Sequence, residues 1–383
     1  MGYSIRLGTI HGIAINVHPT FALILLWVMY QWGISARAGL VGILFGTLVL
    51  LAVFGCVLLH ELAHAIVALR HGLRVQDITI LPIGGVARIE QTALSPKAEA
   101  VIALAGPALN LIIAATLTPL VILVAAIRDV DQPFNVLLFA DEVSPTGFLL
   151  YIWVANIMLA LFNLIPAFPM DGGRVLRAAL SSFRGRLVAT RVAVAIGQTF
   201  AVLLAIGGLL VGDYLMPLVS VFILIAAWME GRHVAVESAL RRLDVGQFAL
   251  WDAGGVSPDE PLTHAIRGGP RDLVVTQGTA VVGMLWRHQI LQHLNGGHRE
   301  LYVRDLMDRR FNAVEVGDSI YDVHAWMQAA NRNAVAVVDG GTYRGIFTSE
   351  RLGHVYVYLG QPRARTHGTT LRSRFRRLRP AAR

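Results

Sequence analysis

Six stretches of this chain are rich in apolar side chains and free of charged ones. A helix needs about 20 mostly apolar residues to cross a lipid bilayer. The four central stretches reach that length, and the first and last, which are shorter, can borrow flanking polar residues. The pattern predicts an α-helical polytopic membrane domain with six transmembrane helices within residues 1–231. The stretches are 19–33, 38–59, 100–127, 143–170, 192–212 and 214–229.

The composition supports this prediction. Charged residues make up 15% of the chain and hydrophobic residues 55%, whereas soluble proteins have about 25% charged residues. So little charge excludes an ordinary soluble globule, and the single cysteine excludes a disulfide framework or a cysteine-rich metal site. No basic segment or small-residue cleavage site precedes the first apolar stretch, so we expect that stretch to be retained as a span.

The formal net charge of +8 is concentrated at one end of the chain. Residues 361–383 hold eight arginines and no acid, while the remainder balances 25 basic with 25 acidic side chains. The charge therefore does not indicate a nucleic-acid-binding fold. We expect residues 360–383 to form a disordered basic tail that is attracted to anionic lipid headgroups, with nucleic acid as the second choice of partner.

The segments between the apolar stretches alternate in charge. The positive-inside rule places the more basic set in the cytoplasm, which predicts a multi-pass protein of the cell membrane with both termini cytoplasmic. The basic set contains Arg6, Arg70, Arg74, Arg88, Lys97, Arg174, Arg177, Arg184, Arg186, Arg191 and Arg232. The other set contains only the basic residues Arg37 and Arg128, with the acids Asp129, Asp131, Asp141, Glu142 and Asp213.

An ionisable cluster, His60-Glu61-Leu62-Ala63-His64, closes the second apolar stretch. Charged groups inside a span are costly, so they mark functional sites. Two histidines four residues apart on a helix face the same way and can share a metal ion. Glu61 beside them is placed to take a proton from water at that metal.

A third ligand is expected far along the chain, because hydrolytic zinc sites have three protein ligands and an open position. The fourth stretch ends in Asn163-Leu164-Ile165-Pro166-Ala167-Phe168-Pro169-Met170-Asp171-Gly172-Gly173. Its prolines break the helix, and irregular backbone at membrane depth is tolerated where it is buried or lines a wet cavity. Asp171 is the natural third ligand. Both motifs close spans of the same direction, so we expect a shallow site towards the cytoplasmic face.

With these two motifs, residues 1–231 resemble the site-2 protease family of intramembrane zinc metalloproteases, peptidase family M50. The resemblance rests on His60-Glu61-x-x-His64 and on Asn163-x-x-Pro166 leading to Asp171-Gly172, with Met170 where the family usually has leucine. It implies one Zn²⁺ per chain held by His60, His64 and Asp171, with Glu61 as catalytic base. It also implies that Asn163 steadies substrate or oxyanion, and that the substrates are single-span membrane proteins such as anti-sigma factors.

Two further segments resemble family elements. Pro82-Ile83-Gly84-Gly85-Val86 lies where the family has a hairpin in the membrane that pairs with extended substrate; a simple glycine turn is the alternative. Asn110, in Gly106-Pro107-Ala108-Leu109-Asn110, either faces the site or bonds a neighbouring helix.

Residues 245–359 are more polar and repeat with an offset of about 60 residues. Asp272-Leu273-Val274-Val275 parallels Asn333-Ala334-Val335-Ala336, and Gly283-Met284-Leu285 parallels Gly345-Ile346-Phe347. The doubled strand–helix–strand–strand–helix order resembles a pair of cystathionine-β-synthase (CBS) modules, a cytoplasmic α/β domain. We place a degenerate copy at 245–302 and a second copy at 303–359.

The resemblance to CBS pairs raises the question of a nucleotide ligand. The family's ribose-binding acid is missing from both Trp286-Arg287-His288-Gln289 and Thr348-Ser349-Glu350-Arg351. Nucleotide binding is therefore doubtful, and a gating module or a homodimer through the CBS pair is at least as well supported. A membrane transporter or channel with a cytoplasmic CBS pair is the rival function; it does not need the two metal motifs at matched depth.

Overall fold

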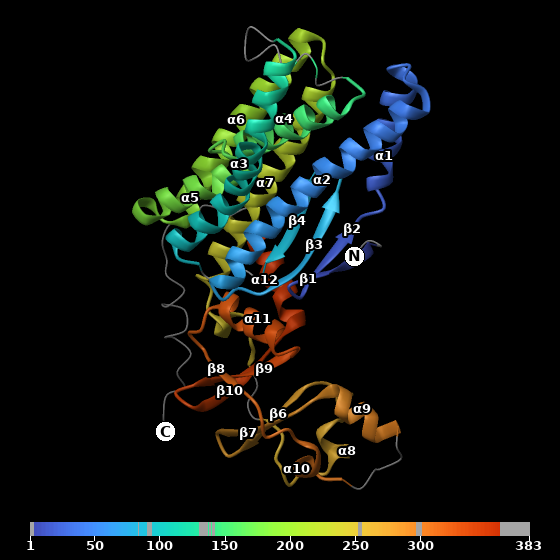
Figure 1. Cartoon of the computed structure of the whole chain (residues 1–383). Coiled ribbons are helices and arrows are strands. Elements are labelled where there is room, and N and C mark those ends of the chain that lie inside the picture. The colour runs from blue at the N-terminus through green and yellow to red at the C-terminus, as the bar shows by residue number, and fades with distance from the viewer. Residues whose placement is uncertain are drawn as a thin grey trace. The chain divides into compact units, whose positions relative to one another are not determined.

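The computed structural model describes residues 4–82, 84–89, 94–129, 137, 139, 142–251, 255–295 and 301–360. The chain divides into two compact units, Met1–Val234 and Ala235–Arg383. The boundary falls inside one helix, α7 (Leu215–Leu240), so this element is common to both units (Figure 1). The predicted basic tail lies outside the described residues.

Among the described residues, five helices of the first unit are long and apolar enough to cross a membrane. They are α2 (Gly39–Arg70), α3 (Pro96–Ile127), α4 (Pro145–Asn163), α6 (Arg186–Val211) and α7. The first apolar stretch forms α1 (Phe21–Tyr30) and a π-helical turn, η1 (Gln31–Ser35), which together are shorter than the five. The expectation of a polytopic helical domain is confirmed, while a sixth span stays a prediction.

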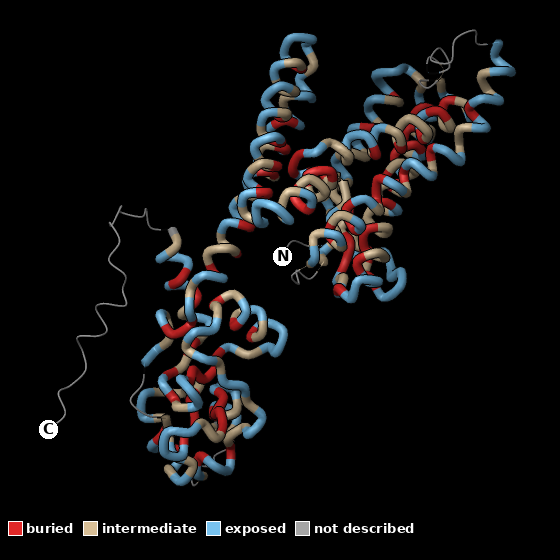
Figure 2. The backbone as a smooth tube through the Cα atoms, turned by 90° about the vertical axis from the view of Figure 1, so that its left-hand side faces the viewer, coloured by how far each residue is buried: buried red, intermediate tan, exposed pale blue. Residues whose placement is uncertain are grey.

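The outer faces of these helices carry large apolar side chains. Leu44 on α2, Ile122 on α3, and Leu203 and Leu210 on α6 are all exposed, and buried residues gather along the inner helix faces (Figure 2). Soluble proteins rarely expose so much contiguous apolar surface. The pattern fits helices whose outer faces contact lipid.

The break that the prolines predict after the fourth apolar stretch is present, and a new helix begins directly beyond it. Helix α4 ends at Asn163, and a turn containing Pro166 and Pro169 leads to α5 (Asp171–Arg184). Gly172 and Gly173 are buried where α5 begins, and added Cβ atoms would meet the backbone of the preceding turn. The glycines thus let α5 start directly against that turn, which positions Asp171.

A four-stranded mixed sheet packs beside α2. The strands β1 (Ile5–Ile10), β2 (Ile13–Val17), β3 (Val75–Leu81) and β4 (Gly84–Ile89) lie in chain order; β2 and β3 are parallel and the other pairs are antiparallel. The hairpin expected around residues 82–86 is confirmed, whereas β1 and β2 are absent from our sequence prediction. Ala65 of α2 packs with Ile13 and Ile78 of the sheet, and Ala68, one turn on, packs with Ile102 of α3. Helix α2 is therefore held between the sheet and α3.

The order helix–strand–strand–helix occurs twice in the second unit. The two copies coincide with the two halves of the sequence repeat. The first copy is α8 (Leu262–Ala265), β6 (Leu273–Gln277), β7 (Ala280–Leu285) and α9 (Arg287–Asn295). The second is α11 (Ile320–Ala329), β9 (Ala334–Asp339), β10 (Thr342–Thr348) and α12 (Ser349–Gly360), preceded by β8 (Ala313–Glu315). At the place of a leading strand the first copy has an isolated bridge, Val256 to Val275.

Short elements complete the second unit: η3 (Val245–Gln247), β5 (Leu250–Trp251) and α10 (Val303–Leu306). The sheets have the orders β5-β10-β9-β8 and β6-β7. Each copy has its own apolar cluster, and a third cluster joins the copies, with Met284 and Trp286 from the first packed on Ala336 and Tyr343 from the second. The predicted doubling is confirmed, and the module boundaries stay a prediction.

Candidate metal centre

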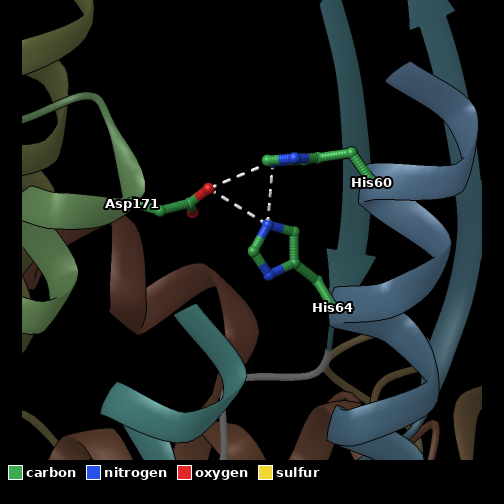
Figure 3. Close-up of side chains that lie close together, drawn as sticks. All are labelled: His60, His64 and Asp171. Atoms are coloured by element: carbon green, nitrogen blue, oxygen red, sulfur yellow. Dashed lines mark hydrogen bonds and ion pairs between the residues drawn. The ribbon is translucent and has the colours of Figure 1, made fainter. Parts of the chain in front are cut away.

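Three side chains from two distant segments converge in the first unit. His60 and His64 lie one turn apart on α2, and Asp171 is the first residue of α5. Asp171 Oδ2 lies 3.2 Å from His60 Nε2 and 3.0 Å from His64 Nε2, and the two Nε2 atoms are 3.1 Å apart (Figure 3). Both histidines are buried. The structure thus brings together the three residues that the sequence singled out as ligands.

The three donor atoms fit a zinc ion in type and spacing. Ligands about 2.0–2.1 Å from a tetrahedral zinc lie about 3.3 Å from one another, close to the separations observed. Two imidazoles and a carboxylate are also a ligand set that hydrolytic zinc sites use. All three atoms can bind one metal cation at the same time. Hydrogen bonds cannot link all three pairs, because the two imidazole nitrogens do not carry enough protons.

Helix α3 orients the His64 ring and leaves room beside the donor atoms of both histidines. The Ile102 carbonyl lies 2.7 Å from His64 Nδ1 and can accept a hydrogen bond from it, which leaves Nε2 of His64 free to bind a metal. One turn on, a Cβ added at Gly106 would come under 3.0 Å from Nε2 of both histidines. A glycine inside a helix costs about 1 kcal/mol relative to alanine. Here it keeps open the space in front of the donor atoms.

Glu61 lies against strand β4. A Cβ at Gly85 would clash with the Glu61 side chain, so only glycine allows this approach. Glu61 and Ala87, also on β4, line the same cavity. The Glu61 side chain, which starts on α2, is thus packed against β4.

Glu61, His64 and Asp171 open onto one cavity of about 360 Å³. Its lining includes both acidic and basic side chains, so it is a polar space among apolar helices. The charged or titratable lining residues are Glu61, His64, Glu99, Asp171, Arg174, Arg177, Arg186, Glu230 and His233. Such a cavity can hold the water that peptide hydrolysis requires.

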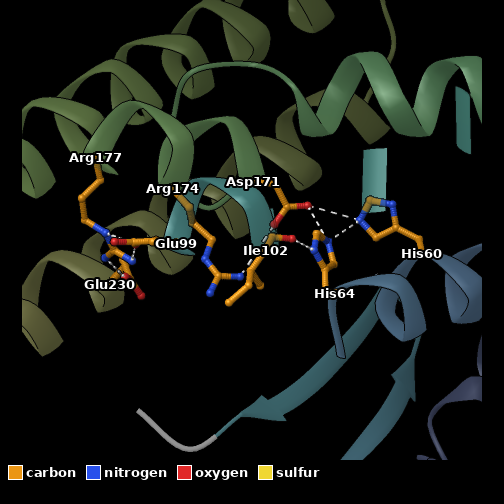
Figure 4. A network of polar contacts seen from close by, with 8 residues as sticks. All are labelled: His60, His64, Glu99, Ile102, Asp171, Arg174, Arg177 and Glu230. Atoms are coloured by element: carbon orange, nitrogen blue, oxygen red, sulfur yellow. Dashed lines mark hydrogen bonds and ion pairs between the residues drawn. The ribbon is translucent and has the colours of Figure 1, made fainter. Parts of the chain in front are cut away.

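A buried ion-pair network lies along the same cavity, and the sequence analysis missed it. Arg177 of α5 donates to Glu99 of α3, with Nε 2.7 Å from Oε1, and to Glu230 of α7, 2.5 Å away (Figure 4). Glu99 and Arg177 are buried. Part of the signal was present, since Glu99 directly precedes an apolar stretch, but nothing in the sequence pairs Glu99 with Arg177. The network ties three helices together at the level of the cavity.

The electrostatics of Asp171 support an ionised ligand. Arg174 Nη1 lies 3.9 Å from its other oxygen, Oδ1, and this nearby positive charge favours the charged form of the carboxyl group. The carboxylate is therefore charged at neutral pH, as a metal ligand must be.

The other residues singled out by the sequence are placed differently. Gly85 and Val86 line the cavity, whereas Gly84 is not among its lining residues. Asn163 donates from Nδ2 to the Leu159 carbonyl 2.9 Å away and does not line the cavity. Asn110 is fully buried, and neither of its amide atoms finds a partner among the described residues.

The chain is similar in sequence to known zinc metalloproteases. A zinc metalloprotease of Methanocaldococcus jannaschii is 33% identical over 356 residues, which span 91% of this chain and 94% of that protein. The family model named Peptidase family M50 matches residues 48–207, which include all three donor residues and Glu61. The chain belongs to peptidase family M50. It is a zinc metalloprotease, which agrees with the donor set described above.

Other proteins match smaller parts of the chain. Stage IV sporulation protein FB of Bacillus subtilis is 27% identical over 165 residues, 42% of this chain and 46% of that protein. The solved site-2 protease of Methanocaldococcus jannaschii is 35% identical, covers 60% of this chain and 95% of its own, and superposes with a TM-score of 0.45.

The C-terminal unit is similar to solved CBS-containing proteins. One is a hemolysin-like protein containing a CBS domain from Oenococcus oeni, 16% identical, covering 30% of this chain and 92% of its own with a TM-score of 0.27. That score is too low to support an argument, so the interpretation of this unit rests on its doubled order of elements.

Proposed function

We propose that this chain cleaves single-span membrane proteins, such as anti-sigma factors, within or near their transmembrane segments. His60, His64 and Asp171 hold one zinc ion, and Glu61 is the catalytic base. The observation that carries the proposal is the triangle of donor atoms, 3.0 to 3.2 Å apart, with Glu61 of the membrane helix α2 lining one cavity together with His64 and Asp171.

The chemistry divides between the metal and the chain's own residues. When bound, zinc polarises a peptide carbonyl and makes water a nucleophile at neutral pH. Glu61 takes the proton that the attacking water loses and delivers it to the departing amide nitrogen. Ile102 and Asp171 orient the histidine donors, and the packing of Gly85 on Glu61 keeps the base in place.

Strand β4 supports a way to hold the substrate. Among the described residues β4 pairs only with β3, so its other edge presents unpaired backbone groups. A helical substrate must unwind before its carbonyls are accessible, and an unwound segment can add to β4 as a further strand. Gly84, Gly85 and Val86 begin β4, and the latter two line the cavity. Substrate or oxyanion contacts by Asn163 and Asn110 stay predictions, and neither residue is among those that line the cavity.

A crosslinking experiment tests this strand pairing. A photoreactive residue at Val86, which is half exposed, should crosslink to a substrate segment next to the cleaved bond. The same probe at Phe183, an exposed residue at the end of α5, serves as the control. Equal crosslinking at both positions would exclude docking on β4.

The proposed topology is six spans with both termini in the cytoplasm. It includes the shorter helix α1–η1 as the first span and places the metal centre towards the cytoplasmic face. Cysteines introduced at Ser182 and Tyr214, on a Cys56→Ala background, should be labelled only from the inside and only from the outside, respectively. The reverse pattern would place the metal centre near the outer face.

For the second unit we propose a pair of CBS modules, 245–302 and 303–359, that gates the protease or joins two protomers. Trp286 is buried where the copies meet, and no ribose-binding acid follows it. We therefore expect ATP to bind the purified unit weakly or not at all in calorimetry; micromolar affinity would contradict this. The basic tail would add contacts to anionic lipid, measured as loss of vesicle binding when 361–383 are deleted.

The whole proposal is tested with purified full-length protein in detergent. We expect about one zinc per chain and cleavage of a model single-span substrate that stops with a chelator and returns with added zinc. Binding of zinc without cleavage of any of several single-span substrates would refute the protease assignment, and transport or channel activity would then have to be measured.

A further inference from the structure

Two arginines one turn apart on α5 differ in what they contact. Arg177 is saturated: it donates to Glu99 and Glu230, and its guanidinium lies 4.9 Å from the centroid of the Phe168 ring. Arg174 has a single polar contact among the described residues, Asp171 Oδ1 at 3.9 Å, which is longer than a hydrogen bond. One arginine therefore holds helices together, and the other keeps its five N–H donors available.

Arg174 points into the cavity that contains the donor triad. It lines this space together with Glu61, His64 and Asp171, and it is close enough to Glu61 to interact with it electrostatically. Figure 4 shows its side chain between Asp171 and the network of Arg177.

Peptide hydrolysis produces negatively charged oxygens that the Arg174 guanidinium could bind. Water adds through its oxygen to the scissile carbonyl carbon, one proton passes to Glu61, and the carbonyl oxygen becomes negatively charged. The C–N bond then breaks, and Glu61 returns the proton to the leaving nitrogen. The N-terminal fragment ends in a new carboxylate, which ionises by losing the remaining proton of the added water. A planar guanidinium matches a carboxylate better than any other side chain does.

We propose that Arg174 binds the developing oxyanion during cleavage and then the new carboxylate of the N-terminal fragment. This inference rests on the proposed proteolytic function and adds a residue to it. Asn163, the residue that the family resemblance suggested for the oxyanion, donates to its own helix and stands outside the lining of this cavity. Arg174 is the basic side chain of the lining that also pairs with a ligand of the donor triad.

A purely positioning role is the alternative, in which Arg174 only orients Asp171 for the metal. The two roles predict different losses when Arg174 is replaced. Loss of a positioning residue weakens zinc binding, whereas loss of an oxyanion donor lowers kcat and leaves zinc in place. Removal of one such donor typically lowers kcat by about 10²–10³-fold.

The test uses full-length Arg174→Gln and Arg174→Lys, with Arg184→Gln as the matched control on the exposed end of the same helix. We expect Arg174→Gln to keep its zinc affinity and its KM within about threefold and to lose about 10²–10³-fold in kcat. Arg174→Lys should recover part of the loss, and Arg184→Gln should behave as the parent. Zinc affinity that falls in parallel with kcat would assign the residue to positioning and overturn the proposal.

A binding measurement completes the test without turnover. In a Glu61→Gln background that keeps zinc, an apolar peptide ending in a free carboxylate is compared with the same peptide ending in an amide. We expect the acid to bind at least about tenfold more tightly and Arg174→Gln to remove this preference. An unchanged preference in the variant contradicts the inference even though the parent cleaves its substrate; a parent that cleaves nothing contradicts the proposed function instead.

Discussion

Two aspartates, one in each unit, have opposite surroundings. Asp308 in the second unit accepts from the Arg310 backbone N–H at 2.9 Å, from Trp286 Nε1 at 3.1 Å and from Arg332 Nη2 at 3.1 Å. Every partner is a true donor. Asp171 instead shares one oxygen with two imidazole nitrogens that are also within 3.1 Å of each other, so their protons cannot satisfy all three contacts.

The difference separates a structural carboxylate from a ligand. Asp308 and Arg332 link the two copies of the repeat, with Arg332 stacked 4.3 Å from the centroid of the Trp286 ring. A fully satisfied network of this kind makes a structure specific. Nδ1 of His60, one of the two histidines that Asp171 contacts, is buried and has no partner among the described residues. A buried polar group without a partner in a native fold calls for an explanation, such as a bound water, a bound ion or a catalytic role.

The strongest test of this contrast exchanges the two aspartates for alanine. Asp171→Ala should lose bound zinc and all measurable cleavage, because one of three protein ligands is gone. Asp308→Ala should keep about one zinc per chain and cleavage within about threefold of the parent. Zinc analysis of both purified proteins decides; full zinc in Asp171→Ala would mean that the third ligand lies elsewhere.

Glu61→Gln separates the base from the ligands within the same cavity. We expect zinc to stay bound and turnover to fall by about 10²–10⁴-fold, the usual contribution of general acid–base catalysis. Single-turnover cleavage together with zinc content provides the measurement. Turnover within tenfold of the parent would show that another group moves the proton.

Gly106→Ala tests whether the space beside the histidines is reserved for the metal. The new Cβ would crowd Nε2 of both histidines, so we expect zinc affinity to fall at least about tenfold, the loss seen when groups around a metal site are disturbed. Gly55→Ala on α2 is the control, because a Cβ there has no atom within 4 Å. Competition with a chelator measures both; equal affinities would mean that α3 does not limit the site.

The smallest effect concerns the stability of the second unit. Burial raises the pKa of Asp308, but the Arg310 backbone, Trp286 and Arg332 together lower it below its usual value. The ionised group therefore stabilises the fold above the unfolded pKa of about 3.9, and this contribution disappears as the pH falls through the folded pKa. Asp308→Asn should lower the free energy of unfolding by about 1 kcal/mol at pH 7.

Denaturant titrations of purified residues 235–383 at several pH values check this prediction. The difference between parent and Asp308→Asn should shrink below pH 4 and vanish once the carboxyl is protonated in both states. A difference that does not change with pH would show that the asparagine acts through packing and not through lost charge.

Local patterns in the sequence determined much of this protein. The apolar stretches predicted α2, α3, α4, α6 and α7, because membrane thickness sets the length of a span. The spacing of His60 and His64 predicted a shared ligand face, because helix geometry is the same wherever a helix forms. The doubled repeat predicted the order of elements in the second unit. Each of these depends on neighbours in the sequence, so no tertiary information was needed.

Other features were decided only by tertiary packing. Asp171 meets histidines that are 107 and 111 residues away, and the sequence could propose this encounter but not its geometry. Nothing local distinguishes Arg174 from Arg177, or Gly106 from Gly55. Strands β1 and β2 become recognisable only once β3 provides an edge. The role of such residues depends on what α2, α3, α5 and α7 place opposite them, and helix packing sets those distances through contacts between residues far apart in the chain.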